Sequence, residues 1–374
     1  MIPYSTQDIN EDDVRAVART LRSGRLTQGP AVERFECELA LCARARYAVA
    51  FNSGTAALHA AYFAAGVSYG DEVIVPAITF AATGNAALYL GARPIFADID
   101  KFATMDVANA ASKITKRTKA IVPVDYGGRP AAMREYRALA RKHGLVLVAD
   151  AAQSLGGQYR GKPIGSHADM TIFSFHPVKS ITTGEGGAVV TNNSSYATQL
   201  RLFRTHGIAK DKTLQKRGGT WHQEMRHLGY NYRMPDINAA LGTSQLKRLR
   251  GFIEKRRTAA ARYEKLLRNI HGVSLPPVER TYERSAWHLY PIRVDKKKRR
   301  AVFEGLRAAG IGVQVHHIPV YLHPYYQKLG YRKHSCPQAE EFYEEEISLP
   351  LFPAITVNKQ KFVAKTLARI LKSL

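Results

Sequence analysis

The sequence predicts an α/β protein whose large domain is built on a mostly parallel sheet and is followed by a smaller α+β domain. Along the first half of the chain, short apolar runs alternate with helical patterns, as they do in βαβ units. These runs are apolar almost continuously, which is typical of strands covered by helices on both faces of a sheet. A long helical pattern later leads to Pro276 and Pro277, and the character of the chain changes beyond them. We expect two domains, a large one over residues 1–245 and a small one over 246–374.

The predicted strands of the large domain are short and rich in β-branched residues. They span residues 45–51, 72–76, 94–97, 120–124 and 145–149, and a further apolar strand leads into Phe173. Helical segments lie between them: one begins at Ala56, and another runs from Ala131 to His143. In open α/β sheets ligands bind beyond the carboxyl ends of the strands, so the residues that follow each run deserve the closest reading.

The second half of the chain predicts a long helix and then a small mixed region. A pattern rich in Leu, Ala, Lys and Arg extends from about Ile237 to Arg268. A strand is expected from His288 to Val294 and a helix from Arg300 to Ala309, and the apolar stretch 310–315 follows. This succession is the basis for the α+β domain.

The composition is that of an ordinary folded protein. The chain has 374 residues, of which 45% are hydrophobic and 9% aromatic. No apolar run approaches the ~20 residues that span a bilayer, and the N-terminus lacks the apolar core of a signal peptide. Only Cys37, Cys42 and Cys336 occur, without a CxxC motif, and the first two would face different sides of a helix. We expect a cytoplasmic protein with no membrane association and no structural metal.

The charge balance is unusual, because 55 Lys and Arg residues against 31 Asp and Glu give a net charge of +24. A protein this basic could bind nucleic acid, or it could steer small polyanions such as nucleotide-linked substrates. The basic residues are dispersed. The one dense run, Lys296–Arg300, lies between a predicted strand and helix, where we expect a solvated turn and helix start. Neither a helix-turn-helix pattern nor zinc-finger spacing is present, so charge alone does not indicate a nucleic-acid-binding protein.

Lys179 lies in the most informative stretch of the chain, Phe173–Gly187. An apolar strand there leads into a loop of small residues, hydroxyls and glycines. A nucleophilic lysine must be partly desolvated so that its amine is often neutral, and it needs room for a planar partner. A strand followed by a Gly-rich turn supplies both conditions. From this stretch alone, however, Lys179 could equally be an ordinary surface residue.

Three other segments place suitable chemistry at the ends of predicted strands. Asn52–Ala56 joins a strand to a helix, where free N–H groups and hydroxyls can hold a phosphate, although many such turns look alike. Asp150 ends a strand and precedes Gln153, so the pair could hold a pyridinium nitrogen and a ring hydroxyl; alternatively, Asp150 could cap the next segment. Phe80 follows a strand that ends at Pro76 and could offer an aromatic face or pack in the core.

Taken together, these residues are the parts required to hold pyridoxal 5′-phosphate (PLP). Its aldehyde needs a lysine, and its pyridine nitrogen needs a carboxylate that keeps it protonated, so that the ring accepts electrons from the breaking C–H bond. The ring also needs a stacking partner, and the phosphate needs hydroxyls and helix-terminal amides. Lys179, Asp150, Phe80 and Ser174 with the 52–56 turn meet these needs.

The chain resembles the DegT/DnrJ-type sugar aminotransferases of the fold-type I PLP family along nearly its whole length. The resemblance rests on the motifs 52–58, 150–153, 173–179, 184–187 and 229–240. It implies a mostly parallel, mixed seven-stranded sheet flanked by helices, a cofactor that cycles between PLP and pyridoxamine phosphate (PMP), and an obligate homodimer with active sites at the subunit interface.

The resemblance also implies a role for individual residues. Lys179 would be the Schiff-base lysine and the proton shuttle, and Asp150 would pair with the pyridine nitrogen. Gln153 would contact the ring hydroxyl, and Phe80 would lie on the ring face. The remaining cofactor contacts would be made to the phosphate, by Thr55, the Ala56 amide, Ser174, and Asn231 of the neighbouring subunit.

Within the family, four further stretches indicate the substrate. Residues 23–30, 124–128, 314–321 and 339–350 are most similar to the transaminases of pseudaminic acid biosynthesis. These enzymes move an amino group from L-glutamate to C4 of a UDP-linked 4-keto-6-deoxy-N-acetyl-hexose, giving UDP-4-amino-4,6-dideoxy-N-acetyl-β-L-altrosamine. Another UDP- or dTDP-4-keto-6-deoxy sugar used for surface glycans is the alternative.

Expected substrate contacts are less specific. In related enzymes the regions of Thr27, Arg233, His316 and Tyr321 approach the nucleotide diphosphate, which cationic and hydrogen-bonding groups suit. The pair His316–His317 could instead be structural, and no third ligand has the spacing of a metal site. We assign no substrate-binding role to the basic stretch Lys210 to His227.

Two rival functions remain. One is a PLP-dependent sugar 3-dehydratase of the same fold, but the relatives with that chemistry carry histidine where Lys179 stands. The other is a non-catalytic basic regulator or nucleic-acid binder that uses the +24 charge.

Overall fold

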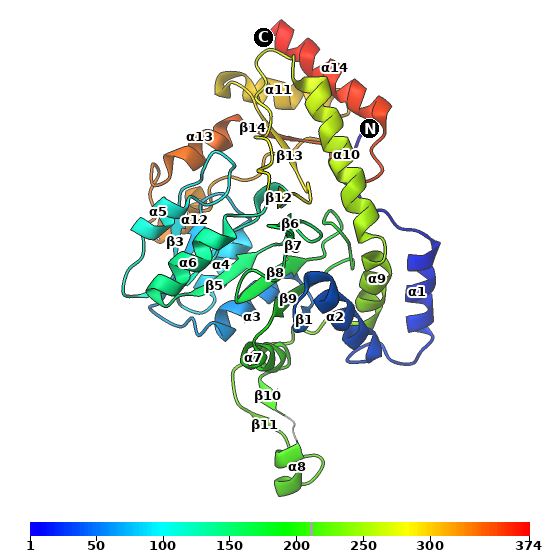
Figure 1. The fold of residues 1–374 in the computed structure, drawn as a ribbon, viewed down its shortest axis with the longest axis vertical. Helices are drawn as coiled ribbons and strands as arrows, with labels where there is room; N and C mark the ends of the chain where they lie inside the picture. The colour runs from blue at the N-terminus through cyan, green and yellow to red at the C-terminus, as the bar shows by residue number, and fades with distance from the viewer. Residues whose placement is uncertain (210–211) are drawn as a thin grey trace.

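A single seven-stranded sheet lies at the centre of the computed structural model, which describes residues 1–209 and 212–374 (Figure 1). Its strand order is β1-β9-β8-β5-β4-β2-β3. The strands are β1 (Tyr47–Phe51), β2 (Glu72–Pro76), β3 (Arg93–Ala97), β4 (Thr118–Ile121), β5 (Val146–Asp150), β8 (Met170–Ser174) and β9 (Gly187–Thr191). All neighbouring pairs are parallel except those of β9, which runs antiparallel to both β1 and β8. The predicted mixed, mostly parallel sheet is confirmed.

Helices cover both faces of this sheet, which explains why its strands are apolar throughout. Along β5, Val148 belongs to one buried cluster while Leu147 and Ala149 belong to another. The first face is covered by α3 (Gly54–Ala64), α4 (Ala81–Leu88) and α7 (Ser194–Arg204), and the second by α2 (Pro30–Ala43) and α6 (Met133–His143). Alternation of side chains along a strand therefore fills two cores at once.

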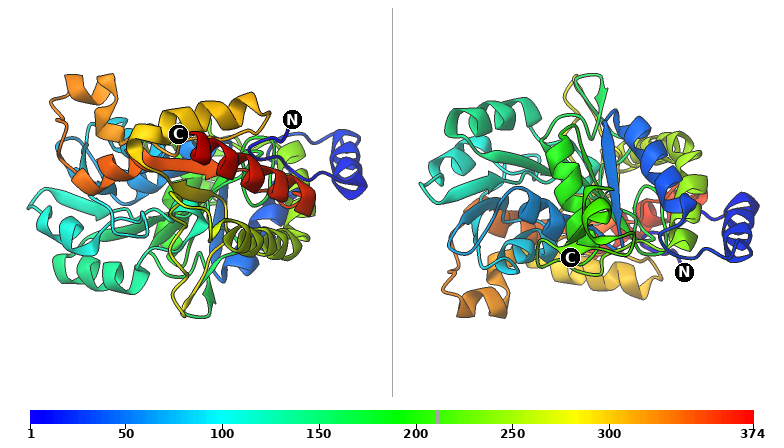
Figure 2. Two further views of the ribbon diagram at one scale, coloured as in Figure 1. Left: turned by 90° about the horizontal axis from the view of Figure 1, so that it is seen from above. Right: turned by 90° about the horizontal axis from the view of Figure 1, so that it is seen from below.

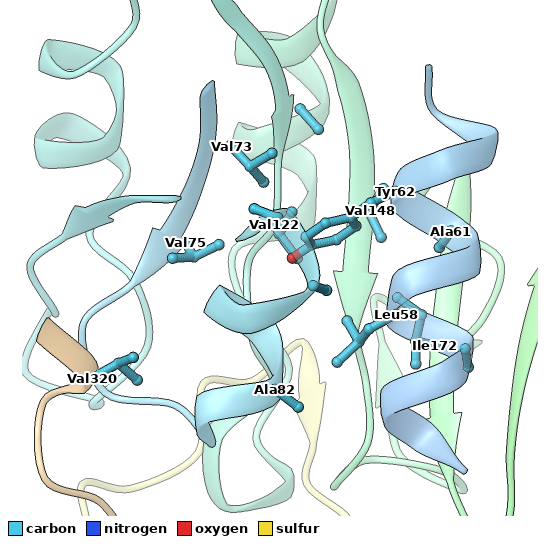
Figure 3. Close-up of a cluster of buried hydrophobic side chains, with 14 of the residues drawn as sticks. Leu58, Ala61, Tyr62, Val73, Val75, Ala82, Val122, Val148, Ile172 and Val320 are labelled. Carbon is cyan, nitrogen blue, oxygen red and sulfur yellow. The ribbon is translucent and has the colours of Figure 1, made fainter. Parts of the chain in front are cut away.

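Helix α3 packs directly over the strands, as Figure 3 shows for Leu58, Ala61 and Tyr62. The Tyr62 ring is fully buried, and its hydroxyl donates to the Thr83 carbonyl oxygen of α4 at 2.9 Å. This bond joins the two helices whose first turns lie at the carboxyl ends of β1 and β2. The fold thus fixes the two helix starts on which the site is built.

The long helix predicted over 237–268 is divided into α9 (Asp236–Leu246) and α10 (Leu249–Leu267). The break at Arg248 coincides with a long-range ion-pair network: its guanidinium contacts Asp8 at 2.8 Å and also pairs with Asp13 of α1 (Glu11–Leu21). These partners lie more than 230 positions away in the chain. Local sequence pattern carries no trace of them, so it predicts one continuous helix.

The C-terminal part has a buried cluster of its own. Strands β13 (Tyr290–Arg293) and β14 (Glu346–Leu349) pair antiparallel, and α10, α11 (Lys296–Ala308) and α14 (Val357–Ser373) pack around them. Figure 2 shows α11 and α14 lying side by side. The basic run 296–300 forms the first turns of α11, capped by Asp295, which accepts the Lys297 N–H at 2.8 Å.

Short elements complete the described chain. The stretch 310–315 makes only isolated bridges, such as Gln314 with Ser348. The remaining elements are α5 (Val107–Ser112), η1 (Tyr126–Gly128), β6 (Gln158–Tyr159), β7 (Lys162–Pro163), β12 (Glu283–Arg284), η2 (Val320–Leu322), α12 (Pro324–Lys328) and α13 (Pro337–Glu345). None of the helices in residues 1–209 and 212–374 is both long enough and apolar enough to cross a membrane.

An arm projects from the body of the protein beyond α7 (Figure 1). It contains β10 (Ile208–Ala209), α8 (Lys212–Gly218) and β11 (Glu224–Met225), and the two strands pair antiparallel. The basic stretch Lys210 to His227 lies in this arm, except that residues 210 and 211 fall outside the described part of the chain.

Candidate active site

A cavity of about 390 Å³ opens at the carboxyl ends of the sheet strands. It brings together residues that the sequence places far apart. Those predicted from the sequence are Thr55, Phe80, Asp150, Gln153, Ser174, Lys179 and His316, and all seven line the cavity. Parallel strands deliver their following residues to one edge of a sheet, and this edge is where the predicted chemistry converges.

Lys179 stands in the hairpin loop between β8 and β9, which closes tightly on itself. The loop begins where the Phe175 N–H donates to the Gly186 carbonyl at 2.9 Å, and the Lys179 N–H donates to the His176 carbonyl at 2.9 Å. Burial in the cavity wall lowers the pKa of Lys179 from 10.5 to about 8, with the Asp150 carboxylate opposing and Arg256 adding to the shift. A substantial fraction of this amine is therefore neutral near pH 8. This is the state in which a lysine acts as a nucleophile or accepts a proton.

Asp150 ends β5 on the cavity floor and is almost fully buried. Its Oδ2 accepts the Thr83 hydroxyl at 2.7 Å, and its Oδ1 accepts the Ala152 N–H at 3.2 Å. Burial raises the pKa of Asp150, while these two hydrogen bonds and the charge of Lys179 oppose the rise. A buried carboxylate of this kind favours a cationic ligand group that can pair with it.

Thr83 was missed by sequence reasoning, although it contacts the central carboxylate directly. Its hydroxyl lies 2.7 Å from that of Thr79, so two threonines four residues apart form a short chain that ends on Asp150. Thr83 lies in the first turn of α4 (Ala81–Leu88), whereas Thr79 lies in the connection between β2 and that helix. The signal in the sequence is a pair of threonines directly after a strand end, where ligand-binding side chains gather.

The turn between β1 and α3 leaves backbone donors at a helix start. Ser53 caps the helix, and its Oγ accepts the Ala56 N–H at 3.0 Å, so the Ala56 amide is already satisfied. The amides of Gly54 and Thr55 have no partner among the described residues, as expected in the first turn of a helix. These two amides and the Thr55 and Ser174 hydroxyls are therefore available to bind an anion, whereas the family resemblance implied the Ala56 amide.

Close backbone packing supports this turn from beneath. A Cβ atom on Gly187 of β9 would lie 2.5 Å from the Ser53 carbonyl oxygen, and one on Gly54 would lie 3.0 Å from the Ser174 Cβ. Glycine is therefore required at position 187 for the two strands and the helix start to meet as they do.

Gln153 and Phe80 also line the cavity. The Gln153 side-chain oxygen accepts the Gly127 N–H at 2.7 Å, which leaves its amide N–H groups for the cavity. The Phe80 ring is 63% exposed and lies edge-on to His317, with 6.0 Å between ring centroids. An exposed ring over a cavity indicates that a ligand can cover it.

Histidines from the C-terminal part form the roof. His288 and His317 line the cavity together with His316, and the sequence had not assigned a role to the first two. His288 Nδ1 and His317 Nε2 are buried without a hydrogen-bond partner. Burial lowers the pKa of His317 to about 3 and that of His288 far below its usual range, so both rings are neutral. Buried nitrogens without a partner are rare in folded proteins, and these two belong to side chains that line the cavity.

Five predicted residues do not line this cavity: Ala56, Tyr321, Asn231, Thr27 and Arg233. Asn231 is exposed, and its carbonyl accepts the Asn52 side-chain amide at 3.4 Å, so it lies beside the turn into α3. Thr27 forms an isolated bridge with Pro235. Arg233 lines a separate hollow of about 180 Å³. Within one chain, these side chains do not face Lys179.

Tyr321 is a correction, because the structure buries it in the core. Its side chain is 1% exposed, and its hydroxyl donates to the Glu340 carboxylate at 2.7 Å. A tyrosine in a loop rich in His and Pro suggests a ligand contact, but here Glu340 of α13 accepts the hydrogen bond of the phenol.

Among the described residues, no group of three or more His, Cys, Asp or Glu side chains is arranged to hold a metal ion.

Comparison with known sequences gives a consistent result over the whole chain. Residues 7–368 match the DegT/DnrJ/EryC1/StrS aminotransferase family. The spore coat polysaccharide biosynthesis protein SpsC of Bacillus subtilis is 40% identical over 379 residues, covering 99% of this chain and 97% of SpsC. The UDP-4-amino-4,6-dideoxy-N-acetyl-beta-L-altrosamine transaminase of Campylobacter jejuni (strain 81-176) is also 40% identical, over 378 residues, covering 100% of this chain and 98% of that protein.

Comparison with solved structures extends the likeness to three dimensions. Spr1654 from Streptococcus pneumoniae, in its PMP form, superposes with a TM-score of 0.95 at 31% identity and covers 100% of both chains. PseC from Helicobacter pylori, an aminotransferase involved in the biosynthesis of pseudoaminic acid, superposes with a TM-score of 0.93 at 34% identity, also over 100% of both chains.

Proposed function

Because the chain belongs to the DegT/DnrJ/EryC1/StrS aminotransferase family, we propose that it is a PLP-dependent transaminase that aminates C4 of a nucleotide-linked 4-keto sugar. The observation that carries this proposal is the pairing of Lys179, whose pKa is lowered to about 8, with the buried Asp150 in one cavity. The amino donor in the proposal is L-glutamate. The acceptor is a UDP-linked 4-keto-6-deoxy-N-acetyl-hexose, as in the Campylobacter relative.

The residues of the cavity fit four groups of the cofactor. Asp150 is a buried carboxylate suited to a pyridinium nitrogen. The free Gly54 and Thr55 amides with two hydroxyls suit a phosphate dianion. The exposed face of Phe80 suits an aromatic ring, and the amide of Gln153 suits a ring hydroxyl. When bound, PLP supplies a reactive aldehyde and a ring that accepts electrons.

The chain's own residues then have distinct tasks. Lys179 attaches the cofactor and, with its lowered pKa, can take up and release a proton at Nζ near neutral pH. Asp150 stabilises positive charge at the cavity floor, and Thr83 holds its carboxylate in place. The buried roof of neutral histidines limits the water that reaches Lys179.

A homodimer is part of the proposal. The arm beyond α7 exposes Trp221, Met225 and Leu228, and such apolar side chains on a projecting segment favour contact with another chain. Asn231 and Arg233 lie at the base of the arm and outside their own chain's cavity. We propose that they serve the partner's site, with Asn231 near the phosphate and Arg233 and Thr27 near the nucleotide.

The shared-site arrangement has a direct test. Lys179→Ala and Asn231→Ala homodimers should each be strongly impaired. Dimers mixed by subunit exchange should recover up to about a quarter of wild-type activity, because half of the dimers then carry one complete site. Mixed samples with no more activity than the two variants alone would contradict a site built from two chains.

The second candidate is a 4-aminotransferase for a different sugar. It is favoured by the equal identity to SpsC, which is named for spore coat polysaccharide rather than for pseudaminic acid. The decisive experiment incubates the holoenzyme with L-glutamate and a panel of UDP- and dTDP-linked 4-keto-6-deoxy sugars, and identifies the products by mass spectrometry and NMR. Amination of the UDP-N-acetyl-hexose at C4 is expected; preference for a dTDP-sugar would overturn the assigned substrate.

A further inference from the structure

His316 connects the active-site cavity to a short chain of buried polar groups. Its Nδ1 lies 2.9 Å from the Ser348 hydroxyl, and that hydroxyl lies 2.5 Å from Glu346 Oε1. Glu346 Oε2 accepts the backbone N–H of His316 at 2.7 Å, so these two residues are linked both directly and through Ser348. Both Ser348 and Glu346, on β14, are completely buried. A fully buried carboxyl group linked to a cavity residue both directly and through Ser348 is an arrangement that a structural strand does not require.

The imidazole of His316 is neutral, so it carries a single ring proton. Burial, with a smaller contribution from the charge of Lys179, lowers the pKa of His316 to about 4. The outer nitrogen, Nε2, has no partner among the described residues and is not one of the sealed, unpaired atoms, so a ligand in the cavity can reach it. Whether Nε2 donates or accepts a hydrogen bond depends on which ring nitrogen holds the proton.

The hydrogen bonds of Ser348 and Glu346 determine which ring nitrogen of His316 holds the proton. When Glu346 is a carboxylate it can only accept, so the Ser348 hydroxyl donates to it and Nδ1 must donate to Ser348; Nε2 is then an acceptor. When Glu346 is protonated, it donates to Ser348 Oγ, the hydroxyl donates to Nδ1, and the ring proton resides on Nε2. Each protonation state of Glu346 therefore corresponds to one tautomer of His316.

We propose that Glu346 and Ser348 are positioning residues that hold His316 in the Nε2–H tautomer, so that its ring presents a hydrogen-bond donor to the substrate. The inference rests on the proposed function, since the keto, carboxylate and phosphate oxygens of its reactants are all acceptors. The tautomer itself can be measured without any turnover.

The surroundings of Glu346 favour the protonated form at neutral pH. Burial raises its pKa to about 8, against the opposing effects of Ser348, the His316 N–H and Arg299. Three further groups interact with Glu346 or lie opposite it: Tyr4, Tyr126 and Arg293, the last in register on β13. Lys179 acts on His316 instead. The two tyrosines stay neutral because burial raises their pKa values, and the Arg293 guanidinium instead pairs with Glu345 at 2.6 Å.

The test is nitrogen NMR on holoenzyme labelled with ¹⁵N-histidine, with His316 assigned by comparison with His316→Asn. The wild type should change from the Nε2–H to the Nδ1–H tautomer as the pH rises through about 8. Glu346→Gln should remain Nε2–H at every pH, because the new amide donates to Ser348 permanently. Ser348→Ala should uncouple the ring from Glu346 and abolish the transition. The matched control is Glu345→Gln, the same change one residue away on a side chain that pairs with Arg293, and it should keep the wild-type transition.

Kinetics gives the second readout. Loss of one hydrogen bond should lower the kcat/KM of the wild type roughly 2- to 13-fold at pH values above the tautomer transition. In Glu346→Gln the pH profile of kcat/KM should lack this decrease, while its dependence on the protonation of Lys179 should remain. An Nδ1–H tautomer across the whole pH range in the wild type, or a transition that persists in Ser348→Ala, would overturn the proposal. A wild type with the transition but without transamination of any 4-keto sugar would overturn the proposed function alone.

Discussion

Thr83→Val removes a single hydroxyl and tests how the protein holds the charge of Asp150. The Thr83 hydroxyl donates to Asp150 Oδ2 at 2.7 Å in a fully buried setting, and valine has nearly the same shape. A hydrogen bond to a charged group is worth about 1.5–3 kcal/mol. Its loss should raise the pKa of Asp150 further, because the Thr83 hydroxyl opposes the effect of burial. The charged form of Asp150, which would pair with the cofactor, then becomes less favourable.

The same free energy should appear in cofactor affinity, as an increase of about 10- to 150-fold in the apparent dissociation constant of PLP. Equilibrium titration of the apoprotein with PLP, followed by absorbance, measures it, and a thermal melt of each apoprotein shows that the variant is folded. Thr79→Val is the matched control, since Thr79 contacts the same chain one hydroxyl further from Asp150, and it should weaken binding much less. A Thr83→Val protein that binds PLP within twofold of wild type would refute this account of Asp150.

Three further predictions follow from the geometry. Gly187→Ala should weaken PLP binding roughly 5- to 150-fold, because overpacking of 1–3 kcal/mol falls on the turn that holds the phosphate; an unchanged dissociation constant would show that the turn can shift freely. The rate of covalent modification of Lys179 should rise with pH, with a midpoint near 8, because only the neutral amine reacts. Asp150→Asn should lower that midpoint, because the Asp150 carboxylate opposes the lowering of the Lys179 pKa by burial. A midpoint near 10.5 would contradict the effect of burial. Arg129→Met should cost about 1.5–3 kcal/mol in urea unfolding, because it removes one charged hydrogen bond of the buried Glu283, at 3.2 Å, while Arg280 stays paired with the same carboxylate; a variant as stable as the wild type would contradict this account.

The sheet and its ligand-binding edge could be predicted from the sequence because their signals are local. Lys179 and Asp150 each follow an apolar run, and the topology of a parallel sheet then brings them to one cavity. Strand β9 was not predicted, because its first residue belongs to the glycine-rich stretch that reads as a loop. Its place in the sheet depends on pairing along its whole length with β1 on one side and β8 on the other.

What the sequence could not supply depends on partners far away in the chain. The histidine roof requires residues 288–317 to fold back over the sheet edge. The helix break at Arg248 coincides with ion pairs to Asp8 and Asp13, far away in the chain. Tyr321 was assigned to the substrate because its loop looks like a binding loop, yet its hydroxyl is satisfied by Glu340. The hydrophobic periodicity of a segment does not predict contacts with distant residues, so these contacts are found only in the folded structure.

The central claim, that Lys179 is the residue that holds the cofactor, is tested most directly by trapping the linkage. The holoenzyme is reduced with borohydride, digested and mapped by mass spectrometry, beside Lys179→Ala treated in the same way. The account predicts one modified peptide, carrying the reduced cofactor on Lys179, and none in the variant, which should also lack turnover. A cofactor adduct on another lysine, together with full activity of Lys179→Ala, would contradict it.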